Sequence, residues 1–146
     1  MRGEKIYEVD LDITGVTDYG VTLQGILSGQ ETVPPQGIRF DVAFDGSATG
    51  RLAGRCRGVD YVRVRADGRI DLEIRGVIET ENGSRIALSA DGVAVPRTGE
   101  PIADLVENAS YNTAAEDYAW VNTRQAWGIG TINFDAGKIK FEVYMQ

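Results

Sequence analysis

The sequence contains no histidine and a single cysteine, Cys56. The lack of histidine excludes the Ser-His-acid and Cys-His nucleophile systems, and it removes the imidazole ligands of the usual zinc and non-haem iron sites. One cysteine cannot form an intrachain disulfide, and we expect it to be a buried, unreactive thiol. Any catalysis must therefore use Asp, Glu, Tyr, Lys or water as the proton carrier, and we expect neither a metal nor a cofactor.

Basic residues and long apolar runs are also scarce. The 15 Lys and Arg residues are outnumbered by 22 Asp and Glu residues, and a formal net charge of −7 argues against nucleic acid as a partner. No stretch approaches the 18 apolar residues of a membrane-spanning helix, and residues 1–5 lead into an alternating pattern without an apolar signal segment. We therefore expect a cytoplasmic protein that binds neither nucleic acid nor membranes.

The remaining composition is typical of one globular domain. The chain has 146 residues, of which 42% are hydrophobic, enough for a core without disulfide or metal support. Its 18 glycines suit tight turns and bent strands. We therefore predict a single domain over residues 1–146.

Apolar and polar residues alternate along most of the chain, which is typical of half-buried strands. The alternation is clearest over 7–13 and 38–44, and a weaker pattern over 21–27 predicts another strand. Residues 30–37 include two prolines and are interpreted as a loop. Because no window has sustained helical periodicity, we predict about eight or nine strands joined by turns.

The turn at 66–68 sets the register of the strands around it. A three-residue loop places Val64 opposite Ile70 and Asp60 opposite Ile74 on one apolar face. A two-residue loop would mix apolar and charged residues on both faces. We therefore predict that the even-numbered side chains of this hairpin point into the molecule.

A three-residue loop at 82–84 is predicted in the same way. It places Ile78 opposite Leu88 and pairs Arg75 with Asp91 on the polar face. Asn-Gly alone would suit a two-residue turn, but that register brings an apolar residue opposite a glutamate. We therefore prefer the longer loop.

The fold class predicted from these strands is all-β: a single antiparallel, roughly eight-stranded, closed or nearly closed β-barrel with a central apolar cavity. Gly50, Gly54 and Gly58 recur where strongly bent strands would need them. A β-sandwich is the competing fold. The segment 96–117 is interpreted as a long connection with a helical turn at 102–106, either a lid or a surface excursion.

Asp60 is the candidate catalytic residue. In the predicted register it lies on the apolar face, where burial would raise its pKa and make it an acid or base near neutral pH. The structural alternative is that its carboxylate caps backbone N–H groups near Gly58.

The candidate substrate-binding residues come from two regions. Arg75 and Asp91 form a surface pair in the predicted register, but a bulge would turn Arg75 inward to bind a carboxylate or enolate oxygen. A three-residue loop at 135–137 places Trp127 opposite Met145, in the apolar row. The remaining candidates share one face of a predicted strand: Tyr118, Trp120 and Asn122.

Several motifs in order resemble a known bacterial family. They are Phe44-Asp45-Gly46, the glycine-rich stretch 50–58, Asp71-Leu72-Glu73-Ile74-Arg75, 118–122 and Gly128-Ile129-Gly130. This arrangement resembles domain of unknown function 3237, also described as UPF0311-like. The resemblance implies an eight-stranded barrel similar to allene oxide cyclase, lipocalin-like with a central cavity, and an aspartate at position 60. It implies no settled activity.

Three hypotheses for the function follow. The first is a cofactor-independent isomerase, cyclase or dehydratase that moves a proton through Asp60 on a small apolar or aromatic substrate. The second is a non-catalytic carrier or sensor of a hydrophobic metabolite. The third is a structural domain whose interior is filled by side chains. Self-association as a homo-oligomer is expected for a small bacterial domain.

Overall fold

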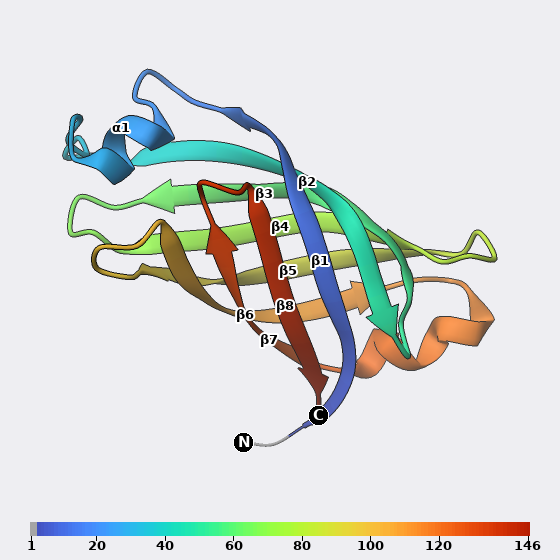
Figure 1. Cartoon of the computed structure of the whole chain (residues 1–146). Coiled ribbons are helices and arrows are strands. Elements are labelled where there is room, and N and C mark those ends of the chain that lie inside the picture. The colour runs from blue at the N-terminus through green and yellow to red at the C-terminus, as the bar shows by residue number, and fades with distance from the viewer. Residues whose placement is uncertain (1–2) are drawn as a thin grey trace.

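The computed structural model describes residues 3–146 as an eight-stranded antiparallel barrel (Figure 1). The beginning of the segment 1–5, where we expect no signal sequence, lies outside the described residues. The strands are β1 (Glu4–Thr17), β2 (Ile38–Gly50), β3 (Gly54–Val64), β4 (Ile70–Glu79), β5 (Arg85–Pro96), β6 (Ile102–Asn112), β7 (Ala126–Asn133) and β8 (Lys138–Met145).

Each strand pairs with the next along the chain, and β8 pairs with β1 to close the barrel. The predicted all-β barrel is confirmed, and the sandwich is excluded. Closure leaves no unpaired sheet edge, and eight strands enclose an interior just wide enough for side chains or one small ligand.

Alternate side chains of every strand point into the barrel and form one apolar core. On β2, Phe40, Val42 and Phe44 are buried, as the alternation predicts. On β4, Leu72 and Ile74 are buried, which confirms the inward direction of the even-numbered residues. The period of two in the sequence is thus the physical origin of the closed, apolar interior.

One end of the barrel is covered by the short helix α1 (Leu23–Ser28). The strand predicted over 21–27 is therefore wrong. The Thr22 hydroxyl caps the helix by accepting from the N–H of Gly25, and Gly29 ends it with a left-handed φ of 79°. Val21, Leu23 and Leu27 lie at odd-numbered positions and so match a strand pattern, and the two caps decide in favour of the helix.

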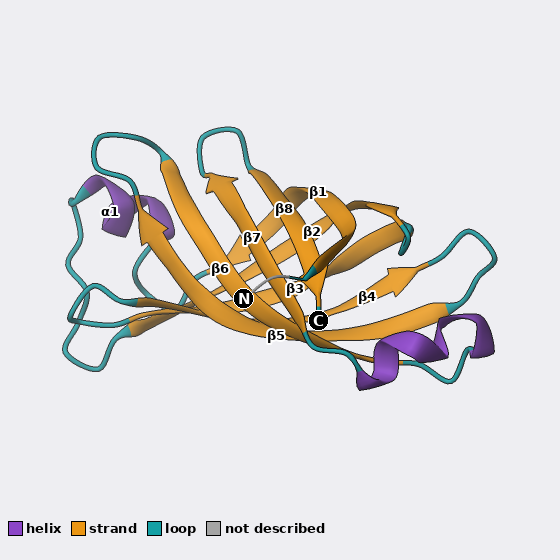
Figure 2. Cartoon of the chain, turned by 90° about the horizontal axis from the view of Figure 1, so that it is seen from below, coloured by secondary structure: helices purple, strands orange, loops and turns teal. Residues whose placement is uncertain are grey.

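The opposite end carries the 3-10 helix η1 (Glu116–Thr123), and Figure 2 shows the two helices at the two ends. The prediction of a long connection over 96–117 is wrong, because β6 occupies 102–112. The expected helical turn at 102–106 is extended and paired on both sides. This segment is a barrel wall and not a lid. None of the helices within residues 3–146 is long and apolar enough to cross a membrane.

The turn between β3 and β4 has the predicted register. Val64 lies opposite Ile70, and Asp60 lies opposite Ile74. The inward position of Asp60 therefore rests on a confirmed register.

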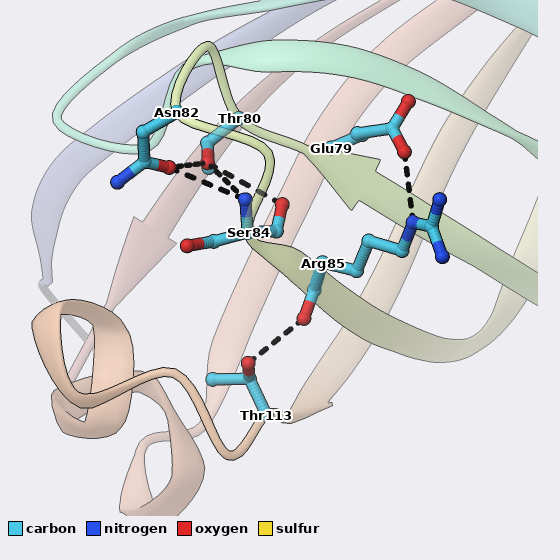
Figure 3. A network of polar contacts seen from close by, with 6 residues as sticks. All are labelled: Glu79, Thr80, Asn82, Ser84, Arg85 and Thr113. Atoms are coloured by element: carbon cyan, nitrogen blue, oxygen red, sulfur yellow. Dashed lines mark hydrogen bonds and ion pairs between the residues drawn. The ribbon is translucent and has the colours of Figure 1, made fainter.

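The turn between β4 and β5 begins one residue earlier than predicted, so that Ile78 lies opposite Ile86 and not Leu88. The N–H of Ser84 donates to the Thr80 hydroxyl at 3.1 Å and to Oδ1 of Asn82 at 3.2 Å (Figure 3). These side-chain contacts favour a loop over 81–83, with its glycine at a φ of 86°.

The turn between β7 and β8 is one residue longer than predicted. Trp127 lies opposite Tyr144 and not Met145. Oδ1 of Asn133 accepts from the N–H of Ala136 and supports a four-residue loop over 134–137. Because a shift of one residue exchanges the two faces of a strand, Trp127 points outward.

Candidate functional site

The barrel interior holds a cavity of about 90 Å³ below α1. Leu23, Ile26 and Leu27 of α1 line its upper end, and its walls are almost entirely apolar. Among the described residues, its lining contains no lysine or arginine. Asp60 and Glu107 are its two acidic residues.

Asp60 lies on β3 and faces this cavity, as the sequence predicts. Its Oδ1 accepts a hydrogen bond of 3.1 Å from the N–H of Glu73 on β4. The regular pairing of β3 with β4 stops after Asp60 and resumes at Arg63, so the carboxylate serves as a backbone partner within this gap. Burial raises the pKa of Asp60 to about 7, although the Glu73 N–H opposes this rise.

Asp60 therefore combines the two interpretations drawn from the sequence. It bonds to a backbone N–H, although that of Glu73 on β4 and not one near Gly58, and it also reaches an apolar cavity with a raised pKa. A structural hydrogen bond does not exclude proton transfer, because the second carboxylate oxygen remains available.

Glu107 on β6 is the acidic neighbour that the sequence analysis missed. Burial raises its pKa to about 8, and the charges of Asp60 and Asp91 contribute further. Its Oε2 is shielded from solvent and has no hydrogen-bond partner among residues 3–146. The residue as a whole is half-buried, because other parts of it line the cavity.

Two glycines make room for the Glu107 side chain. Glu107 lies between Gly92 on β5 and Gly128 on β7. A Cβ at Gly92 would lie 2.7 Å from the Cβ of Glu107, and a Cβ at Gly128 would lie 3.1 Å from its Cγ. Both neighbouring strands therefore lack a side chain where the carboxyl group turns inward.

A signal for Glu107 was present in the sequence. Small and apolar residues alternate with polar ones around it, at Ala103, Leu105, Ala109 and Tyr111. This pattern predicts a strand with Glu107 on the apolar face. The nearby prolines directed the interpretation towards a loop instead.

A second polar cluster lies deeper in the barrel, near η1. The hydroxyls of Tyr7 and Tyr111 are 2.5 Å apart, and their rings meet edge to face. Burial raises the pKa of both hydroxyls, and it raises the pKa of the Cys56 thiol to about 12. These groups are therefore neutral at physiological pH, and the acidic pair holds the titratable protons.

Arg75 and Asp91 line the same hollow on the outer surface, but they do not form the expected ion pair and do not reach the barrel cavity. Arg75 lies opposite Ser89, and its guanidinium contacts Glu73 at 3.3 Å on the outer face. Asp91 accepts from Nδ2 of Asn108 at 2.6 Å, also outside. The earlier start of the β4–β5 turn is the reason for this difference.

The predicted strand face of Tyr118, Trp120 and Asn122 belongs to η1 instead. Trp120 lies under the Arg51 guanidinium, which is 4.0 Å from its ring centroid. Asn122 makes two hydrogen bonds of 2.8 Å with the backbone of Thr113. Like the outward-facing Trp127, these three side chains are absent from the cavity lining.

Within residues 3–146, no cluster of three or more Cys, Asp or Glu side chains is arranged to hold a metal ion. The arrangement that does exist is a pair of carboxyl groups with pKa values near neutrality, facing an apolar cavity. Such a pair can donate a proton to a bound molecule and accept one from it.

Solved structures share this barrel. A β-barrel-like protein from Acinetobacter baumannii matches with a TM-score of 0.78 and 19% identity, over 99% of this chain and 94% of its own. A conserved protein of unknown function from Rhodopseudomonas palustris matches with a TM-score of 0.78 and 18% identity, over 99% and 96%. A protein from Penicillium herquei, described as an enzyme, matches with a TM-score of 0.66 and 18% identity, over 96% and 92%.

At these identities the structural matches demonstrate a common fold alone. No curated protein matches the sequence. A family model described as a protein of unknown function, DUF3237, matches residues 36–146, which include β2 to β8 and both acidic residues of the cavity. The chain therefore belongs to the DUF3237 family.

Proposed function

We propose that this barrel binds a small, mostly apolar or aromatic molecule and acts on it as a cofactor-independent acid/base enzyme: an isomerase, a cyclase or a dehydratase. The observation that carries this proposal is the pair of carboxyl groups, Asp60 and Glu107, in an otherwise apolar cavity. The Penicillium herquei barrel that is described as an enzyme supports the proposal at the level of the fold.

The surroundings of the pair suit proton transfer. Apolar walls exclude water and strengthen the electrostatic interaction between a carboxyl group and the reacting atoms. A pKa of about 7 for Asp60 lets it exist in either protonation state at neutral pH. An acid or base is most effective when its pKa lies near the working pH.

The cavity also limits the size of the substrate. A cavity of about 150 Å³ holds a benzene molecule, and the cavity here measures about 90 Å³. As it stands, it fits a molecule of a few non-hydrogen atoms. A larger substrate requires the α1 side chains Leu23 and Ile26 to move away from the upper end.

A ligand screen followed by product analysis tests the proposal. Neutral small molecules that raise the melting temperature are incubated with the wild type and with Asp60→Asn, and products are followed by NMR. We expect conversion by the wild type and a loss of at least 100-fold in the variant. Asp104→Asn, which changes an outer-face carboxylate paired with Arg97, is the matched control and should retain activity.

Two outcomes would contradict the proposal. Conversion that is equal in Asp60→Asn and the wild type would remove Asp60 from the mechanism. Ligands that stabilise the protein but are recovered unchanged across the screen would favour a carrier or sensor over an enzyme.

A further inference from the structure

We infer that the two carboxyl groups have different roles, with Glu107 as the proton donor and Asp60 as the proton acceptor, and that their substrate is a neutral carbonyl compound. This inference rests on the proposed function and deepens it. It assigns a catalytic role to Glu107, names the chemical class of the substrate, and excludes anions from the site.

Unequal hydrogen bonding separates the two roles. Asp60 accepts a hydrogen bond from the Glu73 N–H, and such a bond favours the ionised carboxylate. Oε2 of Glu107 has no partner in the described part of the chain, so nothing compensates a negative charge there. Protonation turns this oxygen into a hydroxyl, whose hydrogen is free to bond to a ligand in the cavity.

The charges around the pair favour one shared negative charge. Two charges outside the pair contribute: Glu73 on β4 raises the pKa of Asp60, and Asp91 on β5 raises that of Glu107, to which the Asp60 charge also contributes. The polar residues nearest to them in the interior, Tyr7, Tyr111 and Cys56, are neutral.

Strands β1, β2, β7 and β8 contribute no charged side chain to the described lining. Like charges disfavour double ionisation, so the less solvated of the two carboxyl groups keeps its proton. That group is Glu107, because no backbone N–H donates to its Oε2 in the described part of the chain, whereas the Glu73 N–H donates to Asp60.

This division of roles fits the enolisation of a ketone. The Glu107 O–H donates to the carbonyl oxygen while Asp60 removes a proton from the adjacent carbon. The C–H bond breaks, the electron pair forms the carbon–carbon double bond of the enol, and the proton of Glu107 passes to oxygen. The reverse steps return a proton to carbon and restore Glu107, so the sequence is balanced without an oxidant or reductant.

The same charges decide which ligands enter. A carboxylate or phosphate would lie beside the Asp60 carboxylate with no lysine or arginine in the described lining to neutralise it. Burial of an unpaired anion is strongly unfavourable. A neutral molecule with one acceptor oxygen satisfies Glu107 and leaves the remaining surface apolar.

Three probes of similar size test the substrate class: butanone, propionate and propylammonium. Binding to the wild type is measured by NMR chemical-shift titration at pH 7.5. We expect butanone to bind at least tenfold more tightly than propionate. Tighter binding of propionate would overturn the exclusion of anions, and tighter binding of propylammonium would identify the pair as a cation site.

Deuterium exchange tests the two roles. The exchange of the butanone α-protons in D₂O is followed by NMR from pH 5 to pH 10 for the wild type, Asp60→Asn and Glu107→Gln. The wild type should give a bell-shaped profile with limbs near 7 and 8. Asp60→Asn should lose at least 100-fold at every pH and still bind butanone.

Glu107→Gln separates this inference from the proposed function. We expect the basic limb to disappear, because the amide has no proton to lose, and the acidic limb of Asp60 to stay near 7, because Glu107 is already neutral when Asp60 ionises. An unchanged bell in Glu107→Gln would overturn the role of Glu107 while the proposed function stands. Butanone that binds the wild type without exchange above the rate in buffer would contradict both.

Discussion

Replacing Glu107 with glutamine should stabilise the protein increasingly as the pH rises. Glutamine has nearly the same shape as glutamate but cannot ionise. Burial raises the pKa of the Glu107 carboxyl group from 4.5 to about 8, so the folded protein holds this proton more tightly than the unfolded chain. The free energy of unfolding therefore falls as the pH rises.

The magnitude follows from these two pKa values. Below pH 4.5 both states are protonated, and ionisation has no effect on the stability. Between pH 4.5 and 8 only the unfolded chain ionises, and the free energy of unfolding falls by about 1.4 kcal/mol per pH unit. Above pH 8 the loss is complete at about 5 kcal/mol.

Urea unfolding at several pH values between 4.5 and 9 measures this effect. The wild type and Glu107→Gln should have similar free energies of unfolding at the lowest pH. At pH 9 the variant should be more stable by about 3–5 kcal/mol. Asp104→Asn is the control: Arg97 lowers the pKa of that outer carboxyl group below 3.8, so the group is ionised in both states across this range and its substitution should give a difference that does not change with pH.

A difference between Glu107→Gln and the wild type that stays constant with pH would refute the reasoning. It would mean that Glu107 titrates normally in the folded protein. In that case its carboxyl group would be solvated, and neither the shielding of Oε2 nor the acid/base pair could be maintained.

Three other substitutions or reagents test the interior. Tyr7→Phe should lower the free energy of unfolding by about 1–3 kcal/mol, because the Tyr111 hydroxyl loses its only hydrogen-bond partner among the described residues. The double variant with Tyr111→Phe should be less destabilised than the sum of the single variants in urea unfolding. Gly128→Ala should destabilise by about 1–3 kcal/mol, because the new Cβ lies 3.1 Å from Cγ of Glu107; Gly15→Ala, with no atom near its Cβ, is the neutral control. The buried Cys56 thiol, with its pKa raised to about 12, should react with a thiol reagent at pH 8 only in urea, and reaction in the native protein would contradict its burial.

The barrel and the position of Asp60 could be predicted from the sequence because both depend on a period of two. Alternation identifies the inward face of a strand, and the turn at 66–68 was compatible with one register only. That register places Asp60 inside, opposite Ile74. The alternation of apolar and polar residues was sufficient to predict the register wherever one face of a strand was apolar throughout.

Predictions failed where a turn had two compatible positions or two compatible lengths. The β4–β5 turn depends on the Thr80 side chain, and the β7–β8 turn depends on Asn133. Neither contact follows from apolar periodicity. These small shifts moved Trp127 from the inside to the outside and placed Arg75 opposite Ser89 instead of Asp91.

Glu107 was missed because prolines at the ends of a strand were interpreted as marks of a loop. Pro96 ends β5, and Pro101 comes directly before β6, which are positions that tolerate a residue without an N–H. Between these ends apolar and polar residues alternate from 103 to 111, except at Val106 and Glu107. A connection of 22 residues without secondary structure, as predicted over 96–117, is uncommon in a compact domain, and its length alone argues for the missing strand.

The cost in stability of burying Asp60 and Glu107 connects the fold to the proposed function. Two carboxyl groups in an apolar cavity lower the stability at neutral pH, and Gly92 and Gly128 remove side chains that could have filled the space around one of them. A barrel that served only as a structural support would be more stable with an apolar residue at position 107, where the carboxyl oxygen Oε2 has no partner in the described part of the chain. Destabilising groups that persist in a well-packed interior are typical of sites where a ligand or a reaction requires them. The same substitution, Glu107→Gln, should therefore increase the stability and impair the proton transfer, and this opposition distinguishes a functional acid from a tolerated one.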